Sequence, residues 1–291
     1  MKLIWREPIL KYTDDEEAAV YNFYHTQFVR DGRAVLFYTF YIEDKIFRQV
    51  FAASIFDLKS GENERFLIKF KKGTGVTAPC CWKITECDGG YLIDPFAYGE
   101  HSLRQFCLFF DVKSIEKIKR KKGRERRISF QDKTFDFGNL RVKIAKNTTR
   151  KLECTTIDND ERLWTFTVIG YLYTDISEYD GIIYFGTAGQ GGRFYGLNLL
   201  SGEVIHEVNT HGTSSYTRFN NKFYFDGSGY LLEYSPEIKN LYSFSFGKGN
   251  YVSYEVNILA CDGKLYAVVA ERVAKNQDAY AYDYTLACVE P

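Results

Sequence analysis

The stretch that decides the fold is Met1-Lys-Leu-Ile-Trp-Arg-Glu-Pro-Ile-Leu10. It has the pattern of an apolar strand, and no hairpin partner precedes it. At the other end of the chain, residues 265–291 have the pattern of strand, hairpin and strand, and stop where a fourth strand is expected. We therefore predict that the first strand completes the last four-stranded unit, which closes the chain into a ring.

Between the two ends, short hairpin turns recur along the chain. Each lies between runs of alternating apolar residues, and most carry the Asp, Asn or Gly that tight β-turns require. The turns are Asp31-Gly32, Asp88-Gly89, Asp132-Lys133, Asp180-Gly181, Asn220-Asn221 and Asp262-Gly263. Their spacing is close to the length of a four-stranded propeller blade, so the pattern predicts a repeat architecture.

A second turn recurs between the third and fourth strands of the units. It begins with Asp or Asn, which can bond its own backbone two residues further on, and two copies contain Gly, which tolerates a positive φ. The segments begin at Asp57, Asp111, Asp158 and Asn198. These residue types reverse a strand tightly, so each segment predicts a hairpin.

One segment resembles the repeat of a known family. Phe185-Gly-Thr, followed by Arg193-Phe-Tyr-Gly-Leu-Asn198-Leu-Leu-Ser201-Gly202-Glu203, is similar to the repeat of PQQ-like (quinoprotein) β-propellers, which reads roughly A-x-D-x-x-T-G-x-x-x-W. The positions that match the repeat are Gly196, Asn198, Ser201 and Gly202. The Trp position of the repeat is occupied by His206 in this segment and by Arg65 and Lys119 in two other units, whereas Trp164 keeps the aromatic residue in a further unit. The resemblance covers about residues 170–235 and implies blade architecture. No quinone or calcium ligand of the cofactor-using members can be matched here, so we expect no cofactor.

These patterns predict an all-β chain that forms a single β-propeller domain over residues 1–291, with six four-stranded blades. The predicted blades are residues 19–71, 80–120, 126–169, 170–211, 214–248, and 251–291 together with 1–10. The blade count is open by one, because the long loops of the first three blades could contain a degenerate pair. A two-domain β-sandwich is the alternative fold, since those blades match the repeat poorly.

Charge and cysteine content bear on compartment and partners. The 38 basic and 38 acidic residues balance, so the chain has no overall attraction for nucleic acid or an anionic membrane. No run of 18 apolar residues is present to cross a bilayer. The N-terminal residues turn acidic quickly, which is unlike a secretory signal, and the seven Cys are an odd number at irregular spacings. We therefore expect a cytoplasmic, monomeric protein with reduced thiols.

The strongest local charge is the run KSIEKIKRKKGRERR, residues 113–127, with nine basic and two acidic residues. One interpretation is a solvated hairpin whose charges oppose edge-to-edge aggregation. The other is a docking surface for an acidic protein, a phosphate-rich ligand or nucleic acid. The run has no aromatic residues for base stacking, so nucleic-acid binding is not expected. The positive charge of the run nevertheless leaves nucleic-acid binding as an open alternative.

Metal, nucleotide and nucleophile signatures are weak. The four His residues share no ligand spacing, and the nearest candidate, Cys80-Cys81 and Cys87 with His101, places adjacent Cys on opposite faces of a strand. The Gly-rich residues 186–192 lack a following helix and fit a hairpin tip better than a phosphate cradle. We predict no metal site.

The candidate binding residues lie in the first strands of the predicted blades and in the segments before them. They are Tyr24, His25, Trp82, Tyr173, Asp175, Tyr216, Arg218, Tyr254 and Glu255. Tyr and Trp give rigid contact area and recur as interface anchors, although any one ring could simply fill space between blades. The pattern favours a non-catalytic protein-binding module, with an immunity or inhibitor protein of a bacterial toxin system as one setting. The alternative is a hydrolase or lyase acting on a sugar or lactone, with Asp175, Glu255 and His25 as acid, base and orienting group.

Overall fold

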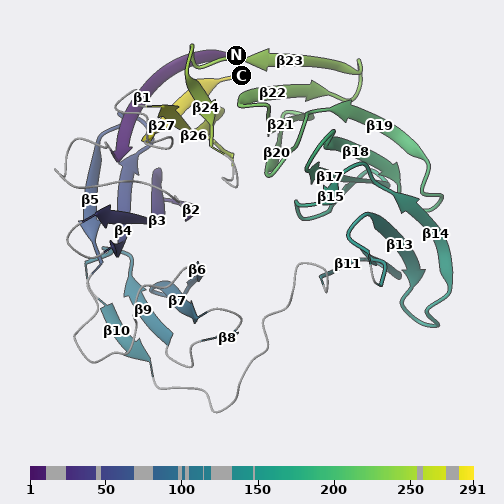
Figure 1. The fold of residues 1–291 in the computed structure, drawn as a ribbon, viewed down its shortest axis with the longest axis horizontal. Helices are drawn as coiled ribbons and strands as arrows, with labels where there is room; N and C mark the ends of the chain where they lie inside the picture. Colours follow the sequence, from purple (N-terminus) through teal and green to yellow (C-terminus); the bar gives the residue numbers. More distant parts are fainter. Residues whose placement is uncertain are drawn as a thin grey trace. The chain divides into compact units, whose positions relative to one another are not determined.

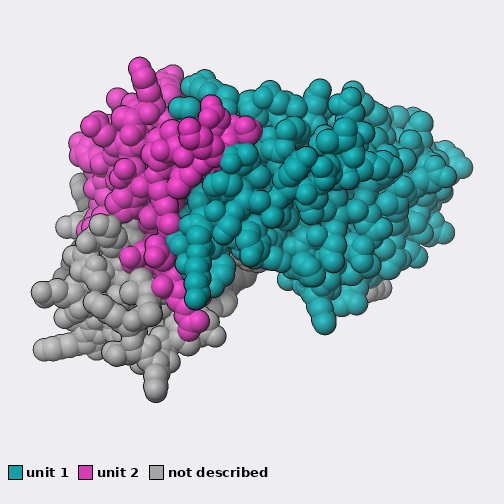
Figure 2. All heavy atoms as spheres, turned by 90° about the horizontal axis from the view of Figure 1, so that it is seen from above, with its two compact units in different colours: residues 1, 128–269 teal, residues 2–127, 270–291 magenta. Residues whose placement is uncertain are grey.

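The computed structural model describes residues 1–10, 24–43, 47–68, 81–97, 100–101, 105–113, 115–118, 133–146, 148–253, 258–272 and 282–291. These residues form antiparallel strands joined by turns and irregular segments, so the described chain is all-β, as predicted. It divides into two compact units, shown in different colours in Figure 2. Unit 1 comprises residue 1 and residues 128–269, and unit 2 comprises residues 2–127 and 270–291. None of the described residues belongs to a helix long and apolar enough to cross a membrane.

Unit 1 contains three complete sheets (Figure 1). The first has the order β11-β12-β13-β14, with β11 (Thr134–Phe137), β12 (Leu140–Ile144), β13 (Lys151–Thr156) and β14 (Arg162–Thr167). The second consists of β15 (Tyr171–Leu172), β16 (Ser177–Tyr179), β17 (Ile182–Ala188), β18 (Arg193–Asn198) and β19 (Val204–Asn209). The third consists of β20 (Tyr216–Phe219), β21 (Lys222–Gly227), β22 (Tyr230–Ser235) and β23 (Asn240–Phe244). The short strands β24 (Asn250–Val252) and β25 (Leu259–Cys261) follow, and β26 (Lys264–Arg272) starts in this unit.

Unit 2 contains two complete sheets and the terminal strands. One sheet has β2 (Tyr24–Arg30), β3 (Arg33–Glu43), β4 (Phe47–Asp57) and β5 (Asn63–Leu67) in sequence order. The other contains β6 (Cys81–Cys87), β7 (Gly90–Ala97), β8 (Glu100–His101), β9 (Gln105–Phe109) and β10 (Ile115–Ile118). Residues 115–118 of the basic run form the strand β10, which pairs with β9, whereas residues 114 and 119–127 lie outside the described part of the chain.

The two ends of the chain pair with each other. β1 (Lys2–Leu10) runs antiparallel to β27 (Tyr282–Glu290), and their register places Lys2 opposite Glu290 and Pro8 opposite Thr285. Figure 1 shows the purple N-terminal strand beside the yellow C-terminal one. The predicted pairing of the first strand with the last is confirmed.

The hairpin turns lie where the sequence places them, with one exception. Asp31, Asp180, Asn220 and Asp262 each have φ near +50°, as tight two-residue turns require. The predicted turn at Asp132-Lys133 is wrong, because the first hairpin of that sheet reverses at Gly138-Asn139, between β11 and β12. Gly138 takes a φ of +59°, which Gly adopts at little cost.

The second turn has the same hydrogen bonds in both units. In unit 1 the amides of Leu200 and Ser201 donate to the side-chain oxygen of Asn198, and in unit 2 those of Lys59 and Ser60 donate to the carboxylate of Asp57. The residue after the Asn or Asp then donates its amide to the first turn of the same sheet. These bonds join Leu199 to the Gly181 carbonyl at 2.9 Å and Leu58 to the Gly32 carbonyl at 3.0 Å.

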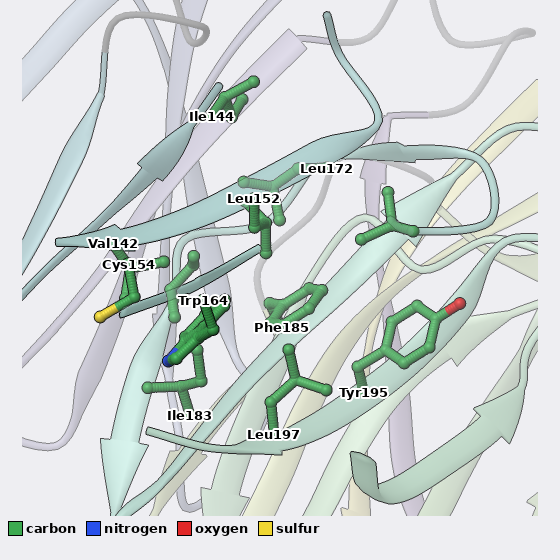
Figure 3. Close-up of a cluster of buried hydrophobic side chains, with 12 residues drawn as sticks. Val142, Ile144, Leu152, Cys154, Trp164, Leu172, Ile183, Phe185, Tyr195 and Leu197 are labelled. Carbon is green, nitrogen blue, oxygen red and sulfur yellow. The ribbon is translucent and has the colours of Figure 1, made fainter. Parts of the chain in front are cut away.

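Trp164 links two sheets of unit 1 through one such turn. Its indole on β14 packs on Gly202, in the turn between β18 and β19, and its Nε1 donates to the Leu199 carbonyl at 2.8 Å. Around it lies a buried cluster drawn from both sheets, which includes Val142, Leu152, Cys154, Ile183, Phe185 and Leu197 (Figure 3). Burial of these side chains against one another is the main force that joins the two sheets.

Unit 2 has a second contact of this kind. Trp5 on β1 lies against Gly61, in the turn between β4 and β5. The first strand of the chain thus supplies a tryptophan to this turn, as β14 does to the turn at Gly202. Sequence comparison of neighbouring units missed Trp5, because its partner turn lies more than 50 residues away.

Candidate functional site

Unit 1 carries an open pocket of about 410 Å³. This volume falls in the range of small-molecule and side-chain binding sites. Three parts of unit 1 line it: Lys133 just before β11, the segment at β15–β16, and the segment that leads into β20. Most of the lining groups are hydroxyls, phenols or charges, so the pocket fits a polar ligand.

The first wall forms where one strand divides. β15 and β16 both pair with β17, and residues 173–176 leave the ladder between them. The amides of Tyr173 and Thr174 donate to the Gly186 carbonyl at 3.2 and 3.3 Å, while the Gly186 amide donates to the Thr174 hydroxyl at 2.8 Å. A Cβ at position 186 would lie 2.7 Å from a methyl carbon of Thr213, so only Gly fits. The backbone beneath Tyr173 and Asp175 is therefore held in place.

The second wall of the pocket, residues 214–218, is held in place by the buried carboxylate of Asp226. Asp226 on β21 is 3% exposed and accepts hydrogen bonds from the Ser214 amide (2.9 Å), the Ser214 hydroxyl (2.9 Å) and the Ser215 amide (2.8 Å). Burial raises the pKa of Asp226 to about 6, although these bonds favour the charged form and oppose the shift. The Ser215 hydroxyl in turn accepts the Ile258 amide at 3.0 Å. Asp226 thus fixes the course of the chain as it enters β20.

The aromatic residues of the pocket have different roles. The Tyr216 hydroxyl donates to the Tyr184 carbonyl at 2.8 Å, and its ring packs edge-on against Phe194 at 5.2 Å. Burial raises the pKa of Tyr216 well above its ordinary value, so the phenol stays neutral. Tyr216 therefore acts mainly as a support between the two sheets. Tyr173 is likewise partly buried, and its ring meets Tyr171 edge-on at 5.9 Å.

Three charged groups line the pocket. Lys133 Nζ lies 2.6 Å from Asp175 Oδ1, and both side chains are substantially exposed. The Arg218 guanidinium stacks over the Tyr179 ring, with its central carbon 4.3 Å from the ring centroid, and donates to Asn221 at 3.0 Å. The lining therefore carries two cations and one carboxylate, which leaves a net positive charge.

The structure brings together four of the nine predicted site residues: Tyr173, Asp175, Tyr216 and Arg218 all line this pocket. Tyr24 and His25 lie on β2 and Trp82 on β6, in unit 2, and the structure describes their backbone but not their side chains. Tyr254 and Glu255 lie outside the described residues. The expected convergence of Asp175 with Glu255 and His25 therefore stays a prediction.

Sequence reasoning missed several groups that build the pocket. Lys133 was interpreted as a turn residue, although it precedes the first strand of its sheet and reaches Asp175. Tyr179 was not singled out, but it follows Ser177 on β16 with the alternation that places both on one face. Asp226 gave no local signal, because its hydrogen-bond partners lie 11 and 12 residues earlier in the chain.

The described part of the chain offers no cluster of three or more His, Cys, Asp or Glu that could hold a metal ion. Of the Cys residues that the structure describes, Cys87, Cys154 and Cys261 are free thiols. Asp175 is the one carboxyl among the described residues that line the pocket.

Comparisons with known proteins give little guidance. No protein-family model and no curated protein matches the chain. Among solved structures, it is similar to the computationally designed Ika4 protein at 12% identity, over 53% of this chain and 87% of that one, with a TM-score of 0.38. It is also similar to BamB from Moraxella catarrhalis at 11% identity, over 91% of this chain and 79% of that one, with a TM-score of 0.37. Similarities of this extent carry no argument about fold or function.

Proposed function

We propose that the chain is a single six-bladed β-propeller, with the N-terminal strand completing the last blade. Three observations support this. The terminal strands β1 and β27 pair, the Trp–Gly contact between an outer strand and a turn occurs in both units, and residues 170–235 resemble a propeller repeat. Closing the sheets into a ring leaves only short, protected edges.

The function proposed for this scaffold is non-catalytic binding of a protein partner at the pocket of unit 1. The observation that carries the proposal is the grouping of Tyr173, Asp175 and Arg218 around one open pocket whose walls are held by buried hydrogen bonds. Preorganised walls lower the entropic cost of binding, and Tyr and Arg are the residues that most often dominate interface energies.

The proposal also covers the biological setting and partner. An immunity-type role in the cytoplasm would make the partner a bacterial toxin, and a monomer that binds through this pocket would hold one toxin molecule. The chain's balanced charge is compatible with this role, because it creates no general attraction for nucleic acid or membranes.

The test is an affinity measurement on a partner identified by pull-down from the native cell. Tyr173→Ala should weaken binding of the purified partner at least about tenfold, as expected for an interface anchor. The matched control is Tyr242→Ala, since Tyr242 lies on β23, is 52% exposed and does not line the pocket. Equal affinities of Tyr173→Ala and wild type would reject the pocket as the binding site.

A further inference from the structure

We propose that the pocket recognises an acidic segment of its protein partner, and that Asp175 is an internal competitor that holds the place of the incoming carboxylate on Lys133. This inference rests on the proposed function, because it names the chemistry that the binding site selects. It assigns Asp175 a role opposite to that of a ligand contact, since its removal should strengthen binding.

The Lys133–Asp175 pair has the properties of an exchangeable contact. Nζ and Oδ1 are 2.6 Å apart, and the side chains are 41% and 68% exposed. Exposed ion pairs contribute little net stability, because water solvates both partners well when they separate. A carboxylate from outside can therefore replace Asp175 on Lys133 at small cost.

The backbone of Asp175 stays in place during such an exchange. Its carbonyl accepts the Thr174 hydroxyl at 2.9 Å, and the Tyr216 hydroxyl, which donates to the Tyr184 carbonyl, lies 3.3 Å from it. The preceding residues are bonded to Gly186 on β17. Displacement thus requires only a side-chain rotation of Asp175 and leaves the wall of the pocket intact.

Arg218 provides a second cation that is loosely held. Its nearest carboxylate, on Asp180, is 4.0 Å away and 93% exposed. The guanidinium is oriented by stacking on Tyr179 and by its bond to Asn221. A planar guanidinium fixed in this way can bind a carboxylate through two parallel hydrogen bonds.

Another ion pair of the same unit has a structural character, and the contrast supports the assignment. Lys222 Nζ also lies 2.6 Å from a carboxylate, on Glu233, but the Glu233 side chain is only 7% exposed. Separating that pair would leave a buried charge without its partner, which is costly. Both cations of the pocket instead face exposed carboxylates, as expected where the ligand itself is an acid.

The charge of the lining selects against other ligands. A cationic segment would meet Asp175 but be repelled by Lys133 and Arg218. Single-stranded nucleic acid requires several stacking platforms along a basic groove, whereas the two cations of this site line a single pocket. A carboxylate-bearing peptide satisfies both cations and leaves the partly buried Tyr173 to contact its stem.

The experiment measures binding of a capped hexaglutamate peptide to the full chain by calorimetric or NMR titration in about 25 mM salt, where exposed charges are weakly screened. Asp175→Asn should bind the peptide about two- to fivefold tighter than wild type, the range expected when a competing exposed ion pair is removed. Lys133→Met and Arg218→Met should each bind it more weakly.

Matched controls separate local competition from overall charge. Asp136→Asn removes an equally charged Asp whose partner, Arg141, is 2.7 Å away, and which does not line the pocket. It should leave the affinity for hexaglutamate unchanged, as should Arg141→Met. Inorganic phosphate, a capped hexalysine and a short oligo-dT are titrated alongside, and each should bind more weakly than hexaglutamate.

Several results would overturn the inference. The first is that hexaglutamate binds neither wild type nor Asp175→Asn, and the second is that Asp175→Asn binds it no more tightly than wild type does. The third is that Asp136→Asn gains as much affinity for hexaglutamate as Asp175→Asn. The fourth is that phosphate, hexalysine or oligo-dT binds the chain more tightly than hexaglutamate does. The proposed function fails separately, when Tyr173→Ala leaves partner binding unchanged. If Tyr173→Ala weakens partner binding while Asp175→Asn does not tighten hexaglutamate binding, protein recognition stands and the internal competitor is rejected.

Discussion

Among the described residues, each unit has one contact between a tryptophan and a turn glycine, but the two contacts are not equally tight. A Cβ at Gly202 would lie 2.7 Å from the Trp164 indole, whereas at Gly61 it would lie 3.1 Å from the indole of Trp5. Both glycines take positive φ, at +73° and +83°. The same local device is therefore used with a closer fit in unit 1.

The indole that makes the closer contact is also the more deeply buried of the two. Trp164 is 8% exposed, lies within a large buried cluster and donates to the Leu199 carbonyl. Trp5 is only partly buried. The turn it contacts begins with the charged Asp57, whereas the turn beneath Trp164 begins with the neutral Asn198. One turn geometry can therefore form either a core contact or a surface contact, depending on how deeply the indole on its glycine is buried.

The largest expected difference follows from removing the two indoles. Trp164→Ala should destabilise the sheets β11–β14 and β15–β19 by about 3–5 kcal/mol, because it leaves a cavity in a close-packed core. Trp5→Ala should cost less, since part of that ring already contacts water. Hydrogen exchange read sheet by sheet measures each loss within its own unit. Trp164→Phe is the control that keeps a ring, and equal losses for Trp164→Ala and Trp5→Ala would contradict the comparison.

A smaller difference is expected when a methyl group is added to each glycine. Ala at a positive φ costs about 1 kcal/mol at either site, and at Gly202 the methyl also clashes with Trp164. We expect Gly202→Ala to cost about 2–3 kcal/mol and Gly61→Ala about 1–2 kcal/mol. In urea unfolding, the double variant Gly202→Ala with Trp164→Ala should lose less than the sum of the single losses, because the clash is then absent. Simple additivity would show that the glycine does not act through the indole.

The sequence predicted those features that depend on a few neighbouring residues. Asp180-Gly181 and Asn198 locate turns because positive φ and side-chain-to-backbone bonds are local properties. The turn at Gly138-Asn139 was missed because the nearby Asp132-Lys133 pair continues the spacing of the repeat.

The pocket could be predicted only in part for a related reason. Tyr173 and Arg218 stood out by residue type in the segments that lead into the sheets. The groups that position them, Asp226 and Gly186, act across strands, and no spacing in the sequence reveals such a pairing. Trp5 was missed likewise, because its contact with Gly61 becomes visible only once the terminal strands are paired.

The turn residues themselves give the smallest expected difference, which depends on pH. The Asp57 carboxylate accepts the Ser60 amide and hydroxyl at 2.8 and 3.1 Å and the Lys59 amide at 3.0 Å. Hydrogen bonds from Ser60, followed by that from Lys59, lower the pKa of Asp57 below its ordinary value of 3.8. The folded state therefore binds a proton at Asp57 less readily than the unfolded state. This turn's contribution to stability is present above pH 3.8 and is lost as the pH falls through the lower pKa of the folded chain.

Asn198 does not titrate, so the equivalent turn in unit 1 should be unaffected over the same range. In an NMR titration from neutral pH into acid, the Lys59 amide should shift with a midpoint below 3.8, together with the Asp57 carboxyl carbon, whereas the Leu200 amide should not follow that transition. Asp57→Asn should abolish the Lys59 transition, because the amide oxygen accepts the same backbone bonds without ionising. A Lys59 midpoint at or above 3.8 would show that the bonds to Asp57 do not favour its charged form, and the two turns would then differ only in how deeply the indole on each glycine is buried.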